Sequence, residues 1–244
     1  MGRMRGQRAG FVVIGLVCAA LSLQAVAANA EKEVIDRKEQ RVLSTRTFLN
    51  AHPDMKYRQE GWEAYQAGDH VLAMKDFMKA SRYADKASQA MVAEMLWRGL
   101  GVPADPSMAY AWADLAAERG YPQFIRLREQ YWRDLDAAQR ERAVRDGQAL
   151  LAEYADAAAR PRMAEFMKKA KQRIRRSASS VSAPKEVRVP DQFGGMMRIP
   201  GHQFYDSKFW DAKEYQAWQD AVWKDLPQGK VDVGGVEQVA PPKE

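Results

Sequence analysis

Cysteine is almost absent from the chain, and this scarcity excludes several kinds of structure and chemistry. The one cysteine among the 244 residues is Cys18, which lies in an apolar stretch near the N-terminus that we expect to be removed. Val17 precedes it, whereas a lipid-attachment site favours a small residue there, so we interpret Cys18 as apolar filler. The remaining chain has no thiol. A disulfide framework, a thiolate metal site and a cysteine nucleophile are therefore excluded.

Histidine and catalytic motifs are scarce as well. The three histidines, His52, His70 and His202, are far apart in turn-like or polar sequence surroundings, and none is spaced i, i+4 from another metal ligand. No G-x-S-x-G nucleophile motif occurs. Carboxylates such as Glu94 and Asp114 are spaced for solvent-facing helix surfaces. We therefore expect no catalytic residue, no metal site and no cofactor, and we expect that the protein is not an enzyme.

Long apolar runs are lacking except near the N-terminus. There, three arginines precede the run FVVIGLVCAALSL, and small residues (AVAANA) stand directly before EKEV. The apolar run is shorter than the roughly 20 residues that span a bilayer. The pattern predicts a secretory signal peptide in residues 1–30, cleaved after Ala30 or after Ala27, and hence a periplasmic or secreted protein. An uncleaved signal that anchors the protein in the membrane is the alternative.

Positive charge is in modest excess. The formal net charge is +6, and the predicted signal peptide carries three arginines and no acidic residue, so the charge falls to +3 on cleavage. A mild excess of this size is not typical of a nucleic-acid partner.

The chain does contain an internal repeat. Residues 55–84 and 87–120 align at an offset of 36. The pairs that this offset aligns are Asp69 with Asp105, Ala73 with Ala109, and Ala80 with Ala116. A period in this range is typical of α-solenoids, in which each helix pair buries its apolar face by stacking on the next pair.

Two glycines interrupt the second repeat in the stretch RGLGVPADP. A phosphate-binding loop needs a preceding strand and successive free N–H groups, whereas here a helix precedes Gly99 and Gly101 and two prolines remove donors. We therefore predict a turn between two helices, with Asp105 as the cap of the second helix.

The second repeat resembles the Sel-one-like repeat (SLR) family, a relative of the tetratricopeptide repeat. Leu96 replaces the family's usual Tyr. The residues that match the family pattern are Gly99, Gly101, Val102, Asp105, Ala109, Trp112, Ala116, Ala117 and Gly120. The first repeat has a shorter turn and is more similar to a tetratricopeptide repeat.

This resemblance implies an all-α fold, a short α-solenoid of antiparallel helix pairs over residues 54–158. It also implies a scaffold for protein–protein interaction. A degenerate last helix is expected to close the array, with Asp136 and Gln139 forming a capping box at its start.

The remaining segments differ in composition. Residues 31–53 are a charged leader, either a short helix or mobile, and residues 159–176 are a basic helix. Residues 177–203 read as a linker with turns, and residues 204–226 as an aromatic C-terminal helix. We expect the tail, residues 227–244, to be disordered.

The basic helix admits two interpretations. Its approximate apolar stripe consists of Met163, Phe166, Met167, Ala170 and Ile174. In the first interpretation the helix is solvated and this stripe packs on the last repeat. In the second, its cations bind an anionic cell-wall polymer or membrane surface. The residues that would do so are Lys168, Lys169, Arg173, Arg175 and Arg176.

The aromatic segment also admits two interpretations. A helix is predicted to begin near Asp211, with Glu214 completing a capping box. Because leaving several tryptophans in water forfeits stability, we expect residues 204–225 to dock on the solenoid as a helix, with Trp218 and Trp223 mostly buried. A free aromatic helix that binds a partner is the alternative.

Function is predicted from the repeat. We expect an exported, non-enzymatic scaffold or adaptor that binds an envelope protein or peptide. The candidate partner-binding residues are Trp62, Tyr65, Trp97, Tyr110 and Trp218.

Overall fold

The computed structural model of the protein describes residues 37–177, 185–190 and 195–224. The predicted signal peptide, the first six residues of the charged leader and the predicted disordered tail lie outside the described residues. The residues that the structure describes belong to a single compact unit.

Two short helices occupy the second half of the charged leader, α2 (Arg37–Leu43) and α3 (Arg46–Ala51). The hydroxyl of Thr45 accepts a hydrogen bond from the Phe48 amide and so caps α3. Val42 and Phe48 are fully buried. Of the two alternatives for the leader, the structure therefore shows the helical one for these residues.

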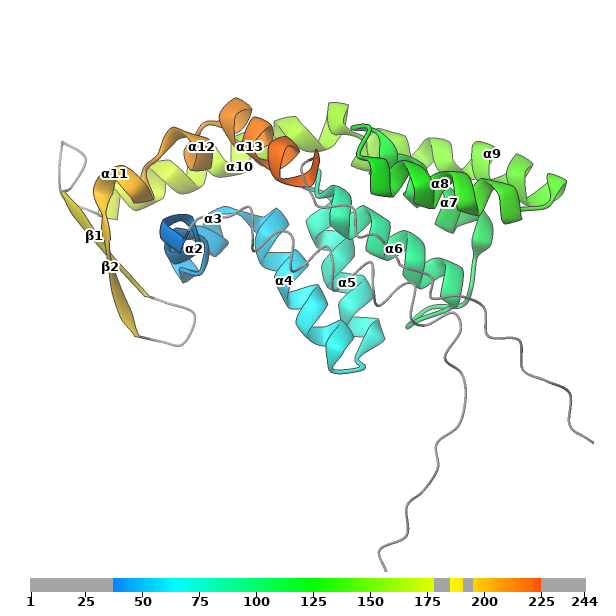
Figure 1. The fold of residues 1–244 in the computed structure, drawn as a ribbon, viewed down its shortest axis with the longest axis horizontal. Helices are drawn as coiled ribbons and strands as arrows, with labels where there is room; N and C mark the ends of the chain where they lie inside the picture. Colours follow the sequence, from blue (N-terminus) through cyan, green and yellow to red (C-terminus); the bar gives the residue numbers. More distant parts are fainter. Residues whose placement is uncertain (1–36, 178–184, 191–194, 225–244) are drawn as a thin grey trace, which may run out of the picture. The chain divides into compact units, whose positions relative to one another are not determined.

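Six helices follow and form the repeat array (Figure 1). They are α4 (Pro53–Gln66), α5 (His70–Ser81), α6 (Lys86–Arg98), α7 (Pro106–Ala117), α8 (Pro122–Asp134) and α9 (Ala137–Tyr154). Helix α4 packs on α5, α6 packs on α7, and α7 also packs on α8 and α9. The predicted all-α solenoid is confirmed.

Aspartate caps start four of these helices. The side chains of Asp69, Asp85 and Asp105 each accept a backbone N–H at the first turn of the helix that follows. Asp136 and Gln139 form the predicted capping box at the start of α9. The caps at Asp105 and Asp136 are those that the sequence predicts, whereas the cap at Asp85 is found only in the structure.

Small residues let the repeat helices approach closely around a few large aromatic side chains. Ala73, Ala109 and Ala113 are fully buried in the core. Trp112 lies among them and packs on Tyr154 of α9, with ring centroids 4.6 Å apart. Small neighbours around one large ring fill the space between helix layers without voids.

The basic helix is longer than predicted, α10 (Asp156–Ser177). Met163, Met167 and Ala170 of its predicted stripe are buried. The helix packs on α3, α12 and α13 as well as on α9. The expectation that the stripe packs on the last repeat is therefore incomplete, because the N-terminal and C-terminal segments supply most of its partners.

A buried ion-pair network fixes the start of α10. Asp156 accepts two hydrogen bonds from Arg119, at 2.8 and 2.9 Å. The Lys86 ammonium, almost fully buried, lies 3.2 Å from Asp156 and donates to Glu118 at 2.7 Å. Burial lowers the pKa of Lys86, and the surrounding carboxylates oppose that shift. These contacts join α6 and the end of α7 to α10.

Residues 177–203 are not only a linker with turns, and that prediction is wrong. They contain an antiparallel hairpin of β1 (Glu186–Pro190) and β2 (Met196–Pro200), in which Glu186 pairs with Pro200. Val189 and Ile199 are buried, while the arginines beside them face out. The alternation of apolar and basic residues in VRV and MRI is a strand pattern too short to stand out in the sequence.

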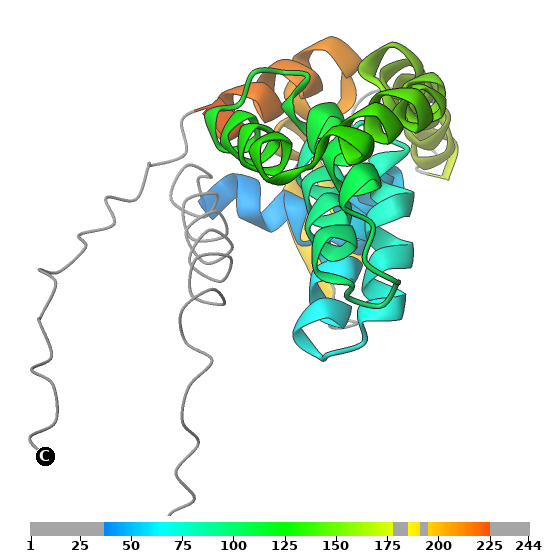
Figure 2. The ribbon, with the colours of Figure 1, turned by 90° about the vertical axis from the view of Figure 1, so that its right-hand side faces the viewer.

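The aromatic segment forms three helices instead of one. They are α11 (Gly201–Phe204), α12 (Ser207–Trp210) and α13 (Ala212–Lys224). Asp211 caps α13 by accepting the Glu214 amide, but the Glu214 carboxylate accepts the Ser207 hydroxyl, so the predicted capping box is not formed. Figure 1 shows α10, α12 and α13 together above α4, α5 and α6, and Figure 2 shows the orange C-terminal helices at the top of the molecule. No helix in the described ranges is long and apolar enough to cross a bilayer.

Candidate interaction site

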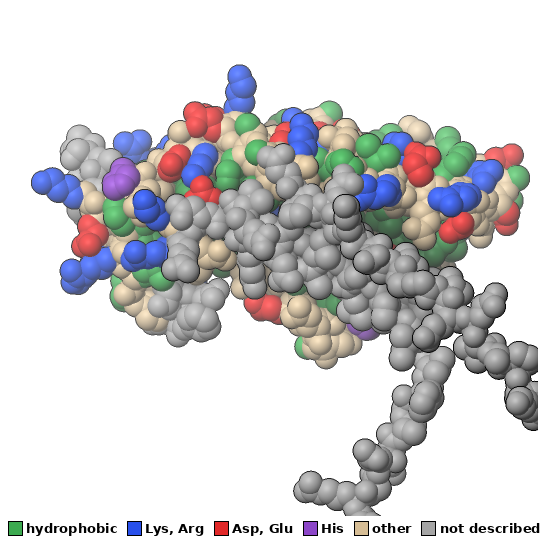
Figure 3. Space-filling model, in the orientation of Figure 1, with side chains coloured by type: hydrophobic (Ala, Val, Ile, Leu, Met, Phe, Trp, Pro, Cys, Tyr) green, Lys and Arg blue, Asp and Glu red, His purple; other side chains and the backbone are tan. Residues whose placement is uncertain are grey.

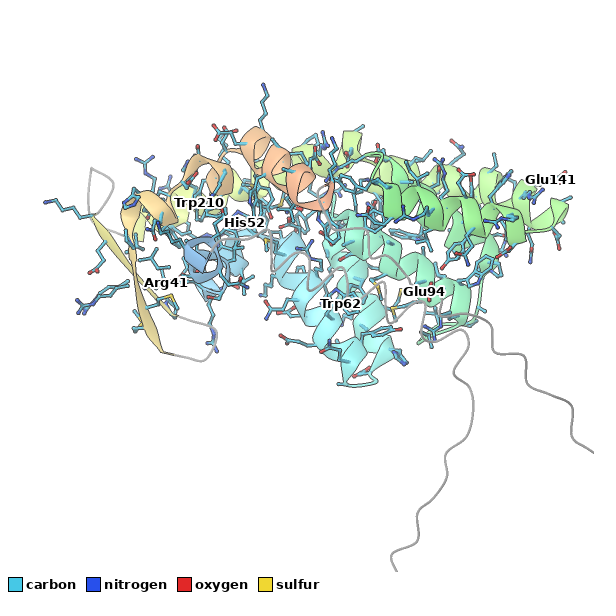
Figure 4. The ribbon with its side chains drawn as sticks, viewed as in Figure 1. Arg41, His52, Trp62, Glu94, Glu141 and Trp210 are labelled. Atoms are coloured by element: carbon cyan, nitrogen blue, oxygen red, sulfur yellow. The ribbon has the colours of Figure 1, made fainter. Side chains whose placement is uncertain are left out.

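The predicted partner-binding aromatics lie in separate pairs on the repeat helices. Trp62 meets Tyr65 edge-on, with ring centroids 5.7 Å apart, and also meets Phe77 of α5. Both rings are partly buried against the core. Figure 4 shows Trp62 on α4, away from the labelled Trp210 of the C-terminal segment.

Trp97 and Tyr110 have partners of their own on α8. Trp97 stacks on Tyr131 with ring centroids 4.1 Å apart and planes inclined by 6°. Tyr110 packs on Trp132 at 4.8 Å. The structure therefore brings these two residues to the α8 side of the array, where each leaves only part of its ring for a partner.

Trp218 lies on α13, far from the other four in the sequence. It is half-buried beside Phe209 and Tyr215. Trp223 and Trp210, by contrast, are buried at 7% and 4% exposure. Most of the surface of Trp218 is buried as expected, but Trp218 remains more exposed than Trp223.

That interface is built around His52 and Asp54, at the junction of α3 and α4. His52 stacks on Phe48, and its Nε2 lies 2.7 Å from the Phe209 carbonyl oxygen. Asp54 accepts hydrogen bonds from the Tyr215 hydroxyl at 2.6 Å and from the Gln219 amide at 2.9 Å. His52 thus lies in the turn between α3 and α4, as expected, but its surroundings are aromatic and buried because the C-terminal segment docks on it (Figure 4).

Burial shifts the pKa values of the two titratable groups of this interface in opposite directions. Desolvation lowers the pKa of His52 to about 4, although two backbone carbonyls favour its charged form. Desolvation raises the pKa of Asp54 to about 6, against its hydrogen bond from Tyr215. Both side chains are therefore biased toward their neutral forms in the folded protein.

An apolar groove on the repeat array lies between α5, the glycine turn and the end of α9, and we call it the α5–α9 groove. Its apolar lining consists of Val71, Met74, Met78, Val102 and Tyr154, and it encloses about 340 Å³. Among the described residues, six large hydrophobic side chains are strongly exposed, and five of them lie on α5 or α9. These five are Val71, Leu72, Met78, Val144 and Leu151. Of these five, Val71 and Met78 line the groove, and exposed apolar side chains at a concave site are typical of a surface that binds another protein.

Cations line the edge of this α5–α9 groove. Lys75, Lys79 and Arg82 follow one another along α5. Lys79 is paired with Asp76 at 2.6 Å and Arg82 with Glu153, whereas Lys75 is exposed. The groove therefore has an apolar floor, and at its edge Lys75 adds a positive charge beside the two paired cations.

The glycine turn forms one wall of the groove. Gly99 ends α6 with φ of 68°, in the left-handed region, and Gly101 has φ of 73°. A Cβ on Gly101 would lie 2.5 Å from the carbonyl carbon and oxygen of His70. Glycine at this position thus permits the turn to lie directly against the start of α5, which places Val102 in the groove.

A protein-family model described as the Sel1 repeat matches residues 86–121, which hold α6, the glycine turn and α7. The chain contains a Sel1 repeat over these residues. Sel1 repeats generally mediate protein–protein interaction. We find no match among curated proteins.

One solved structure is similar to this Sel1-repeat protein, "c5321: a protective antigen present in uropathogenic Escherichia coli strains displaying an SLR fold". The identity is 23% and the TM-score 0.39. The match covers 54% of this chain and 27% of that chain, so the Sel1-repeat protein spans about a quarter of the antigen's length.

The sequence did not reveal the α5–α9 groove. Val71 and Met78 lie on the apolar stripe of α5 and are expected to be core, yet they are exposed because α9 reaches this face only with its last turn, at Tyr154. A signal was present in the run HVLAMKDFM, whose apolar residues cover more of the helix than one buried face requires.

Proposed function

We propose that this Sel1-repeat protein is a non-enzymatic scaffold that binds a protein partner through the α5–α9 groove. The observation that supports it most is the gathering of exposed Val71, Leu72 and Met78 beside a concave apolar site on the repeat array. Covering exposed apolar surface of this kind is favourable by about 25 cal/mol per Å².

The groove also indicates the chemistry of the partner. Its floor is apolar and its edge carries Lys75, Lys79 and Arg82. A complementary segment has apolar side chains flanked by Asp or Glu. The proposed partner is therefore an apolar peptide segment with acidic flanks, in a protein of the bacterial envelope.

The envelope location is part of the proposal and rests on the N-terminal sequence. Export would cleave the chain after Ala30 or after Ala27. N-terminal sequencing of the protein from a periplasmic or secreted fraction should give a chain that starts at Glu31 or at Ala28. Recovery of the chain only from the cytoplasm, with Met1 retained, would contradict export.

A pair of matched variants tests the groove. Val71→Asp places a charge on the groove floor, and Val144→Asp makes the same change on α9 at a comparable exposure, 55% against 68%. A partner recovered in stoichiometric amount from envelope extract should be retained by Val144→Asp and lost with Val71→Asp. Equal recovery by both variants, or equal loss, would rule out the groove as the binding site.

A further inference from the structure

Three basic segments that are far apart in the sequence meet at one end of the described chain. We call residues 37–46, 165–176, 185–190 and 195–202 the basic end. It contains thirteen Lys and Arg residues and three Asp and Glu residues, whereas the net charge of the whole chain is only +6. The rest of the chain is therefore net acidic, and folding gathers the positive excess in one region.

Contacts between the helices and the hairpin bring the segments of the basic end together. Helix α3 contacts both α10 and β1, and α11 contacts α2. Arg41 of α2 donates a hydrogen bond to the Arg198 carbonyl of β2 at 3.2 Å. Figure 4 shows Arg41 beside the hairpin, and Figure 3 shows Lys and Arg side chains gathered at the end that carries β1, β2 and α11.

The C-terminal part of α10 is close to α11 as well. Figure 1 shows the C-terminal end of α10 reaching α11, and the charge of Arg175 on α10 opposes the rise that burial causes in the pKa of Tyr205, directly after α11. The last turns of α10 therefore lie beside the hairpin and α11, and their cations add to those of β1 and β2.

The cations of the basic end outnumber its carboxylates. Glu165 pairs with Lys169 at 3.1 Å, Glu186 lies 3.9 Å from Arg198, and Glu39 pairs with Lys208 of α12. The three acidic residues of the basic end are thus engaged. Among the described residues no carboxylate pairs with four exposed arginines, namely Arg173, Arg175, Arg176 and Arg188.

An exposed apolar side chain lies in the same region. Met196, the first residue of β2, is 67% exposed. An anionic polymer has no apolar region that would bind such a side chain. A bilayer has charged headgroups for the arginines and an apolar boundary for the methionine. The combination favours lipid over polymer.

We propose that the basic end docks the protein on an anionic lipid bilayer, with the arginines of α10 and of the hairpin at the headgroups and Met196 at the acyl boundary. The α5–α9 groove is built from other helices. The proposal therefore goes beyond the scaffold function and would make the protein a scaffold held at a membrane surface.

Vesicle co-sedimentation tests this proposal. The probes are vesicles of phosphatidylcholine alone and of phosphatidylcholine with phosphatidylglycerol in a 3:1 ratio. The protein is the chain from Glu31 onward, which retains every described residue and lacks the apolar N-terminal stretch. We expect binding to the anionic vesicles only, with an affinity that falls steeply as salt is raised to half-molar.

Two charge variants locate the surface. Arg173→Gln/Arg175→Gln/Arg176→Gln removes three charges from the basic end, and Arg126→Gln/Arg133→Gln/Arg145→Gln removes three exposed charges from α8 and α9. Each cation near an anionic membrane contributes about fivefold in affinity. The first variant should therefore bind on the order of 10- to 100-fold more weakly, and the second should bind as the unmodified chain does.

Variants of the hairpin test whether its arginines and Met196 contribute to binding, and soluble polyphosphate tests whether the ligand is lipid or polymer. Arg188→Gln/Arg198→Gln should weaken binding severalfold, and Met196→Ser should weaken it although the charge is unchanged. Equal loss in the α8–α9 control would overturn the assignment of the surface. Unchanged binding of Met196→Ser, together with equally tight binding of soluble polyphosphate, would overturn the assignment to lipid.

Discussion

At the residue scale, the structure assigns different roles to glycines that the repeat pattern treats alike. Gly101 and Gly120 both have φ of 73°. A Cβ on Gly101 would meet the His70 backbone at 2.5 Å, whereas a Cβ on Gly120 would meet nothing within 4 Å. A residue with a Cβ would be strained at the positive φ of either position. Only at Gly101 would the Cβ also clash with the start of α5.

Substituting each glycine by alanine separates these two effects. Gly120→Ala should lower the free energy of unfolding by about 1–2 kcal/mol, the cost of a left-handed conformation at a residue with a Cβ. Gly101→Ala should cost about 2 kcal/mol more, because the turn must move away from α5. Urea denaturation measures both. Equal losses would show that the turn does not lie against α5.

The pair of His52 and Asp54 predicts an unusual dependence of stability on pH. The pKa of His52 is about 4 in the folded protein and 6.5 ordinarily, so in this range the unfolded chain binds the extra proton and acid favours unfolding. The pKa of Asp54 is about 6 against 3.8, so here the folded protein binds the extra proton and acid favours folding. The two contributions oppose each other between pH 4 and pH 6.

Asp54→Asn removes the contribution of Asp54 to the pH dependence of stability and leaves that of His52. As the pH falls from 7 to 4, the variant should lose on the order of 1–3 kcal/mol of stability relative to the unmodified chain, at about 1.4 kcal/mol per pH unit. Urea midpoints at pH 7, 5 and 4 measure this difference. Parallel pH profiles for the two proteins would contradict the buried, neutral state of Asp54.

At the element scale, local signals in the sequence predicted the repeat helices well and the elements around them less well. Helices α5, α6, α7 and α9 begin after capping aspartates, and these are visible in any sequence. The hairpin was missed because each strand shows only three alternating residues. The start of α13 at Asp211 was predicted, but the capping box was not formed because the Glu214 carboxylate accepts the Ser207 hydroxyl, a contact that no capping pattern indicates.

There is a physical reason why the sequence does not predict the contacts of the C-terminal segment. Tyr215 and Gln219 bind Asp54 across more than 160 residues of sequence. Composition shows that these aromatic and polar groups need partners, but only the fold determines which ones they find. The same limit applies to the basic end, where the cations of the hairpin and α2 join those of α10.

Truncation tests how much the docked segment stabilises the array. Ending the chain at Pro184 removes Phe209, Trp210 and Trp223, which are buried, and leaves Phe48 and His52 without cover. Each large apolar side chain contributes about 1.5–3 kcal/mol, and 1 kcal/mol corresponds to about 2–4 °C in a domain of this size. The melting temperature should fall by at least several degrees.

A shorter truncation is the control for that experiment. Ending the chain at Lys224 removes none of the described residues, so its melting temperature should stay within about 2 °C of the full chain. If the chain that ends at Pro184 also melts unchanged, the aromatic segment is a free recognition element, and partner binding should then be assigned to it.

At the scale of the whole molecule, the scaffold proposal and the membrane proposal use different surfaces. The α5–α9 groove lies on the repeat array, and the basic end is formed by α2, α3, α10 and the hairpin. Neither surface uses the interface around Asp54, which the C-terminal segment fills. The protein could thus hold a partner while it is docked, and a variant at one surface should leave binding at the other unchanged.

Site-specific photo-crosslinking in the native compartment tests the central claim, that the groove binds a protein partner. A photoreactive amino acid at Val71 lies in the groove, and the same amino acid at Val144 lies on α9 outside the groove lining. We expect one discrete adduct from position 71, with an apolar segment flanked by acidic residues at the crosslinked site, and no such adduct from position 144. No adduct from position 71, or the same adduct from both positions, would contradict the account.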